Sequence, residues 1–237
     1  MLKEAIKYIV GLAEPIVEVY DNQWWSNQPL HRVSFNPKAK TIGMTTLSSL
    51  VDYIKSNVDN IETDMIIHVQ SPTKVQMYSA LDDERIREYM VEVNAQLPTF
   101  EFNRFIDHES FCINLQSKFL PNEDRALLLK FAGTVEGGTI AEYGDDGITQ
   151  KATIKTGIAS KGEAIIPNPV LLKPFRTFIE IEQPSSRFIF RMRGDSGIQC
   201  ALYEADGGAW KSVAMNRIKD FLVKQLGDLT EHFTVIC

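Results

Sequence analysis

Three arginines recur in one short segment of the C-terminal half. Arg187, Arg191 and Arg193 interleave with the apolar residues Phe188, Ile189, Phe190 and Met192. Because successive side chains of a strand point to opposite faces, a strand here would place the three arginines on one face and most of the apolar side chains on the other. A basic strand beside aromatic rings is one way to grip single-stranded nucleic acid. An amphipathic strand with ion pairs on its outer face has the same pattern, so both interpretations remain open.

Trp24 and Trp25 are the second candidate feature. They follow Tyr20 and the turn-forming pair Asp21-Asn22, in a polar setting. Protein interfaces are enriched in Trp, Tyr and Arg, so we interpret the two tryptophans as a candidate protein interface. Burial of one of them in the core is equally compatible with the sequence. If both rings prove buried within their own subunit, the interface hypothesis is wrong.

The sequence has no constellation typical of catalysis or metal binding. Its four histidines are His31, His68, His108 and His232. None has the spacing of a zinc ligand set, and we expect His108 to face water in the first turn of a helix. The glycines at 137–138 and 144–147 lack the endings of phosphate-binding loops and are interpreted as turn residues. Around Ser196, the expected His and Asp contexts of a serine nucleophile are missing.

We therefore predict no catalytic residue, no metal ligand and no bound cofactor, and we favour a protein that is not an enzyme. The cysteines, Cys112, Cys200 and Cys237, are odd in number and far apart. This spacing indicates reduced thiols rather than a disulfide framework.

The bulk composition is that of an ordinary globular protein. Of 237 residues, 44% are hydrophobic and 24% are charged, which is too apolar for a disordered chain. The net charge of -6 has the wrong sign for a dedicated duplex-binding domain, although it allows local basic patches. No apolar run approaches the roughly 20 residues of a membrane span, and the first ten residues lack the apolar core of a signal peptide. We expect a cytoplasmic protein without membrane association.

Hydrophobic periodicity predicts an α+β fold, mainly antiparallel sheet with about four to five helices and a sheet-rich C-terminal half. Helices are expected at 2–10, 45–56, 107–119, 121–132 and 213–226. Strands are expected at 16–20, 65–69, 74–78, 139–143, 148–156, 170–172, 177–182, 187–193, 199–204 and 233–236. The stretch 82–93 is ambiguous, because Asp82 and Asp83 could cap a helix whereas 87–93 also alternates as a strand does, and we favour the strand. The length allows a single domain, 1–237, or two subdomains: an α+β part, 1–104, and a helix pair followed by antiparallel sheet and a C-terminal helix, 105–237.

The order of these segments resembles the YfdQ-like family of uncharacterised phage and prophage proteins, over about residues 16–226. The resemblance lies in the segments 44–54, 105–111, 124–128 and 147–154 and in a proline-bounded strand near 166–170. It favours a strand at 87–93. It implies the cytoplasm of a bacterium that carries a phage or prophage, and it supplies no catalytic residues.

Three function classes follow from these observations. The first is a non-enzymatic phage accessory protein that forms a homo-oligomer or binds a host or phage protein. The second is a factor that binds single-stranded nucleic acid or takes part in recombination, a partner disfavoured by the acidic net charge. The third is a protein that sequesters or hydrolyses a small molecule such as a nucleotide in phage–host conflict.

Overall fold

The structure is a computed structural model that describes residues 2–12, 16–20, 23–26, 38–83, 85–134, 150–155, 161–166, 168–194 and 197–237. The chain divides into two compact units, residues 1–38 and 39–237. The described residues form five α-helices and mostly antiparallel sheets, which confirms the predicted α+β class. None of the described helices is long and apolar enough to cross a membrane.

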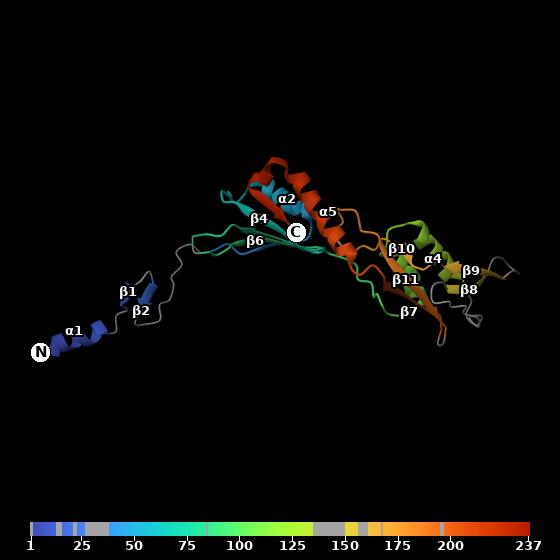
Figure 1. Ribbon diagram of the computed structural model, residues 1–237, viewed down its shortest axis with the longest axis horizontal. Coiled ribbons are helices and arrows are strands. Elements are labelled where there is room, and N and C mark those ends of the chain that lie inside the picture. The colour runs from blue at the N-terminus through green and yellow to red at the C-terminus, as the bar shows by residue number, and fades with distance from the viewer. Residues whose placement is uncertain are drawn as a thin grey trace. The chain divides into compact units, whose positions relative to one another are not determined.

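The N-terminal unit consists of a helix and a hairpin (Figure 1, blue). Its elements are α1 (Leu2–Leu12), β1 (Val17–Tyr20) and β2 (Gln23–Ser26). The two strands pair antiparallel, with Val19 opposite Trp24 and Glu18 opposite Trp25. The strand expected at 16–20 corresponds to β1, and the two tryptophans lie on its partner β2.

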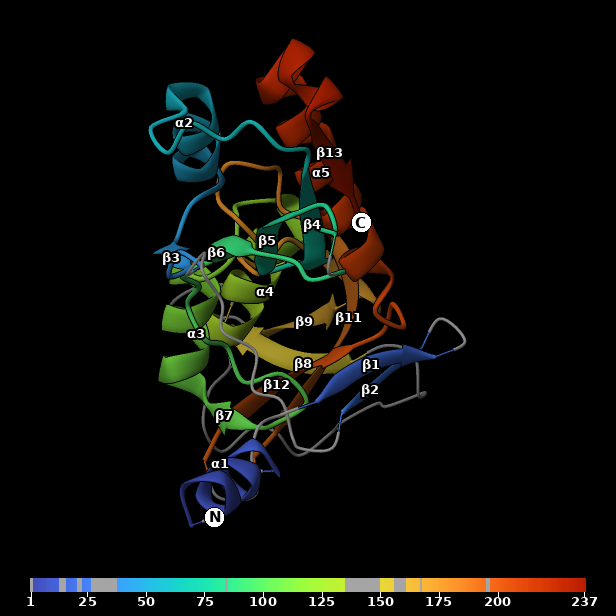
Figure 2. The same ribbon diagram turned by 90° about the vertical axis from the view of Figure 1, so that its left-hand side faces the viewer.

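The larger unit contains a five-stranded sheet in the order β13-β4-β5-β6-β3. The strands are β3 (Ile42–Met44), β4 (Met65–Ser71), β5 (Lys74–Ser79), β6 (Tyr89–Asn94) and β13 (Phe233–Ile236). The three central strands pair antiparallel, and β13 and β3 add at the edges in parallel. Helices α2 (Leu47–Ser56) and α5 (Ala209–Leu226) lie on one side of this sheet, and α5 runs beside β4 and β13 (Figures 1 and 2).

Local chemistry explains why these segments form. The side chain of Thr46 caps α2 by accepting a hydrogen bond from the amide of Ser49 at 3.2 Å, and Asn57 ends the helix in the left-handed conformation. In the strands, buried and partly exposed side chains alternate, as the period of two requires. The buried set packs against α2 and α5. This first core joins residues 47–93 with residues 178–235, so it includes residues from both sides of position 104.

A second sheet has the order β10-β11-β12-β7 and is antiparallel throughout, as predicted for the C-terminal half. Its strands are β7 (Ile106–Asp107), β10 (Val170–Leu172), β11 (Ser186–Arg193) and β12 (Gln199–Glu204). Helices α3 (His108–Ser117) and α4 (Glu123–Thr134) cover one face, where Phe111 and Phe131 contact the ring of Phe190. A hairpin of β8 (Gln150–Lys155) and β9 (Lys161–Ile166) and a short 3₁₀ helix η1 (Gly227–Glu231) complete the described elements.

The strand expected at 177–182 is absent, and this prediction was wrong. The side chain of Gln183 occupies this segment: its carbonyl oxygen accepts from the amides of Arg176 and Thr177, and its amide donates to the carbonyl of Phe178 at 3.0 Å. Because a buried side chain satisfies these backbone groups, the segment needs no ladder partner. The expected strand at 139–143, the turn at 144–147 and Ser196 lie outside the described residues.

Candidate functional site

The three arginines singled out in the sequence lie on β11. Along this strand the side chains of Phe188 and Phe190 are completely buried, whereas Arg187 and Arg193 are exposed and Arg191 is half-buried. The aromatic side chains face α3 and α4 across the second core. The arginines therefore share the face of the sheet opposite these helices, as period two predicts.

Two aromatic rings lie on the same face. Tyr203 of β12 is paired with Ile189 of β11, and Phe105 immediately precedes β7. The ring centroids of Phe105 and Tyr203 are 6.3 Å apart and nearly perpendicular, and the guanidinium carbon of Arg193 is 4.2 Å from the centroid of Phe105. We call the surface formed by Arg187, Arg191, Arg193, Tyr203 and Phe105 the arginine face. Sequence reasoning missed Phe105 and Tyr203.

The arginines of this face differ in how firmly they are held. Arg193 donates from Nε to the side-chain oxygen of Gln199 at 2.7 Å and stacks on Phe105. Arg191 donates to the carbonyl of Phe190 at 3.1 Å. Arg187 is exposed and is paired with Leu171 of β10. The face thus contains two arginines with side-chain contacts on the sheet and one exposed arginine at the β10 side.

On the opposite side of the sheet from the arginine face, a buried arginine contacts the start of β11 and the end of β12. Arg176, of which 8% of the side chain is exposed, contacts Glu204 at 2.8 Å and Asp206 at 3.9 Å, and it donates to the hydroxyl of Ser186. Its guanidinium carbon lies 3.9 Å from the ring centroid of Trp210. Burial lowers the pKa of Arg176 to about 10, against the opposing effect of Glu204, and the group stays cationic at neutral pH. Ser186 begins β11 and Glu204 ends β12, so this contact set fixes both strands.

The tryptophans of the candidate interface lie on β2. Trp25 is 59% exposed, so the two rings are not both buried within their subunit. The side-chain environment of Trp24 lies outside the described residues. Their role as an interface stays a prediction.

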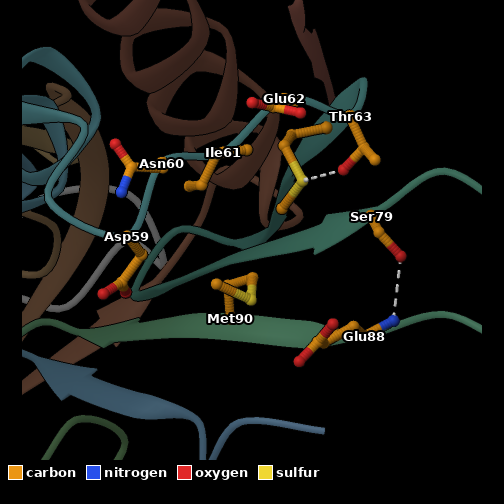
Figure 3. Close-up of a pocket in the computed structure, with 9 residues that line it drawn as sticks. Asp59, Asn60, Ile61, Glu62, Thr63, Ser79, Glu88 and Met90 are labelled. Atoms are coloured by element: carbon orange, nitrogen blue, oxygen red, sulfur yellow. Dashed lines mark hydrogen bonds between the residues drawn. The ribbon is translucent and has the colours of Figure 1, made fainter. Parts of the chain in front are cut away.

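A pocket of about 260 Å³ opens between the segment after α2 and the strands β4, β5 and β6 (Figure 3). Three carboxylates, those of Asp59, Glu62 and Glu88, are among its lining groups. Asp59 accepts a hydrogen bond from the hydroxyl of Tyr53 at 2.6 Å, and burial, together with this carboxylate, raises the pKa of Tyr53. The acidic lining disfavours phosphate groups. Within the described part of the chain, no group of three His, Cys, Asp or Glu side chains is arranged to hold a metal ion.

His108 and Cys112 form a pair that the sequence analysis did not anticipate, because we expected His108 to face water. The Nε2 atom of His108 lies 2.5 Å from the carbonyl oxygen of Ala132 and 3.7 Å from the sulfur of Cys112. A carbonyl accepts only, so Nε2 carries the proton and cannot accept one from the thiol. Burial raises the pKa of Cys112. The pair therefore lacks the lowered thiol pKa of a catalytic cysteine.

Comparison of the chain with protein-family models, curated proteins and solved structures found no match. The resemblance to the YfdQ-like family consequently stays a prediction from the sequence. Any function proposed for the chain rests on the geometry of the arginine face, the acidic pocket and the N-terminal unit.

Proposed function

We propose that the chain acts without catalysis, by assembling with copies of itself through its N-terminal unit, in the phage or prophage setting expected from the resemblance. The proposal rests on one observation. Every side chain of this unit whose exposure the structure describes is exposed, and these include Leu2 at 77%, Ile9 at 64% and Trp25 at 59%.

The apolar side chains of α1 gather on one stripe of the helix. Leu2, Ile6 and Ile9 recur at helical spacing, while Lys3 and Lys7 occupy the other side. A helix of 11 residues is marginal in water without tertiary packing. The stripe therefore needs a surface that covers it.

The hairpin of β1 and β2 has the same requirement. An isolated two-stranded hairpin is marginally stable at best, because it has no core of its own. Val19 is 55% exposed, and the ring of Trp25 adds a large apolar surface on β2. A partner that covers α1 and the hairpin together would supply the missing core, and a second copy of the chain offers a matching set of apolar side chains.

The test is the mass of the purified protein in solution. We compare the wild type with Ile6→Ser/Ile9→Ser, using Lys3→Ser/Lys7→Ser as the control, because both double substitutions introduce the same residue into the same helix. Each buried isoleucine contributes about 1.5 kcal/mol or more, and a two-fold dimer contains four of them, so the isoleucine variant should weaken association by about 6 kcal/mol. This corresponds to roughly a ten-thousandfold change in dissociation constant.

Light scattering coupled to size-exclusion chromatography should therefore give an oligomer for the wild type and the lysine control, and a monomer for the isoleucine variant. Trp25→Ser should also shift the equilibrium towards monomer. A wild type that is a strict monomer would reject the proposal. An isoleucine variant that assembles like the wild type would reject α1 as the interface.

The other function classes have different support. An acidic pocket gives little reason to propose a nucleotide ligand, because its carboxylates repel phosphates. Binding of nucleic acid depends on another surface and is argued separately below.

A further inference from the structure

We propose that the arginine face of the second sheet binds single-stranded nucleic acid, with Tyr203 as a stacking residue and the arginines as phosphate contacts. This inference is independent of assembly through the N-terminal unit. It rests on the charge of the face, on the position of its rings and on the side of the sheet that the helices leave uncovered.

The local charge is opposite to that of the whole chain. Strand register places Leu171, Arg187, Ile189, Arg191, Arg193, Gln199, Ala201, Tyr203 and Asp107 on this side of the sheet. Among these described positions, Asp107 is the one acidic residue. Its carboxylate already accepts from the amide of Ser110 at 2.8 Å, and this hydrogen bond lowers the pKa of Asp107. The described positions on this side of the sheet therefore comprise three arginines and one carboxylate, a basic set on a chain of net charge -6.

The rings are placed where a base could stack between phosphate contacts. Tyr203 is paired with Ile189, so Arg187 and Arg191 lie at the two diagonal positions, about 7–8 Å away. Tyr203 is partly exposed. Arg193 stacks on Phe105 and donates to Gln199, which holds its guanidinium against the ring that Tyr203 also contacts.

The geometry favours an unpaired strand over a duplex. Stacking on a side chain requires a base whose face is free, and bases in a duplex are stacked on each other. From Arg187 to Arg193 the strand spans about 20 Å at its ordinary rise, which is enough for several nucleotides of an extended chain. Helices α3 and α4 pack on the opposite face of the sheet, so they do not cover the arginines.

The experiment measures fluorescence anisotropy of labelled oligo-dT and oligo-rU 20-mers at several salt concentrations, with the wild type and four variants. Arg187→Gln/Arg191→Gln removes two cations of the face. Lys211→Gln/Lys224→Gln is the control, because it removes two exposed cations from α5 and causes the same change in net charge. Tyr203→Ala removes the stacking ring, and Tyr203→Phe retains it.

The wild type should bind with an affinity that falls as salt rises. Each phosphate contact contributes about 0.7 to the slope of log affinity against log salt, so the double arginine variant should lose about 1.4 from the slope while the lysine control keeps it. Tyr203→Ala should weaken binding about tenfold, with Tyr203→Phe close to the wild type. Tighter binding of one oligomer would identify DNA or RNA as the preferred source of the strand.

Three results would overturn the proposal. The first is the absence of binding to either oligomer. The second is an equal loss in the arginine variant and the lysine control, which would indicate a response to net charge alone. The third is unchanged binding by Arg187→Gln/Arg191→Gln. Far-ultraviolet circular dichroism of each variant separates loss of binding from loss of folding, and the single variant Arg187→Gln, at an exposed position, repeats the test if the double variant unfolds.

Discussion

Replacing Arg176 with methionine should destabilise the larger unit, because the guanidinium is buried among groups that depend on it. The side chain contacts Glu204 at 2.8 Å and Asp206 at 3.9 Å and lies on the ring of Trp210. Methionine can fill much of the volume and pack on the ring, but it supplies neither charge nor hydrogen-bond donors. The substitution therefore isolates the polar contribution of this residue.

The expected loss of stability depends on how exposed the carboxylates of Glu204 and Asp206 are, because these groups lose their partner. Removing one partner of a buried ion pair costs about 3–5 kcal/mol. The carboxylate side chain of Glu204 is 36% exposed and can be rehydrated, whereas that of Asp206 is only 12% exposed and loses a favourable charge. We therefore expect a loss of about 2–3 kcal/mol for Arg176→Met. Arg176→Lys keeps the charge but not the planar fork and should lose about 1–2 kcal/mol.

Urea unfolding, monitored by circular dichroism, measures both losses of stability. Each should appear as a lower urea concentration at the unfolding midpoint, with an unchanged dependence of the unfolding free energy on urea. Arg104→Met is the matched control, because the Arg104–Glu101 pair is exposed, at 73% and 60% of the two side chains, and should contribute less than about 1 kcal/mol. A double-mutant cycle of Arg176→Met with Glu204→Gln gives the coupling of the pair directly. If both Arg176 variants unfold within about 0.5 kcal/mol of the wild type, the reasoning that this residue holds β11 and β12 is refuted.

Two further predictions concern titration and thiol reactivity. Hydrogen bonding to Lys74 lowers the pKa of Glu92 from 4.5 to about 2, so its stabilising contribution is present above pH 4.5 and is lost as the pH falls towards 2. Glu92 is a third exposed, so the discounted contribution is about 1 kcal/mol, and the stability gap between the wild type and Glu92→Gln should be smaller at pH 3 than at pH 6; an unchanged gap contradicts this. In alkylation followed by peptide mass spectrometry, exposed Cys237 should react before Cys112, whose pKa burial raises, and before Cys200, whose pKa burial raises to about 12. Faster modification of Cys112 than of Cys237 would mean that it is an activated thiol after all.

Local patterns predicted the elements whose side chains alternate or repeat regularly. The strand Gln199–Glu204 was predicted with its observed bounds. The predicted helix start at Asp107 is also confirmed, because the Asp107 side chain caps the helix by accepting a hydrogen bond from the amide of Ser110. The segment 177–182 was wrongly predicted as a strand. Its β-branched and aromatic residues favour a strand locally, whereas in the structure the side chain of Gln183 binds backbone amides of residues 176 and 177. Tertiary contacts of this kind leave no local signal.

The sequence pattern also did not predict which distant strands pair with each other. Phe233–Ile236 was predicted as a strand, but its parallel position beside β4 depends on α5 returning the chain to the first core. The same limit applies to the candidate site. The strand period of two predicted that the three arginines share one face. Tyr203 and Phe105 lie on that face only because β12 pairs with β11 in this register and because the segment before β7 brings Phe105 to Arg193. The contact of His108 with Cys112 did have a signal, namely their spacing of four residues on one helix face.

The central claim is that the exposed apolar side chains of α1, β1 and β2 are covered by a second copy of the chain. The most direct test is the mass of the purified wild-type protein by light scattering across a hundredfold range of concentration. We predict a particle of at least two chains, which either dissociates on dilution or keeps the same mass at every concentration. A mass of 26.8 kDa, that of one chain, at every concentration would contradict it.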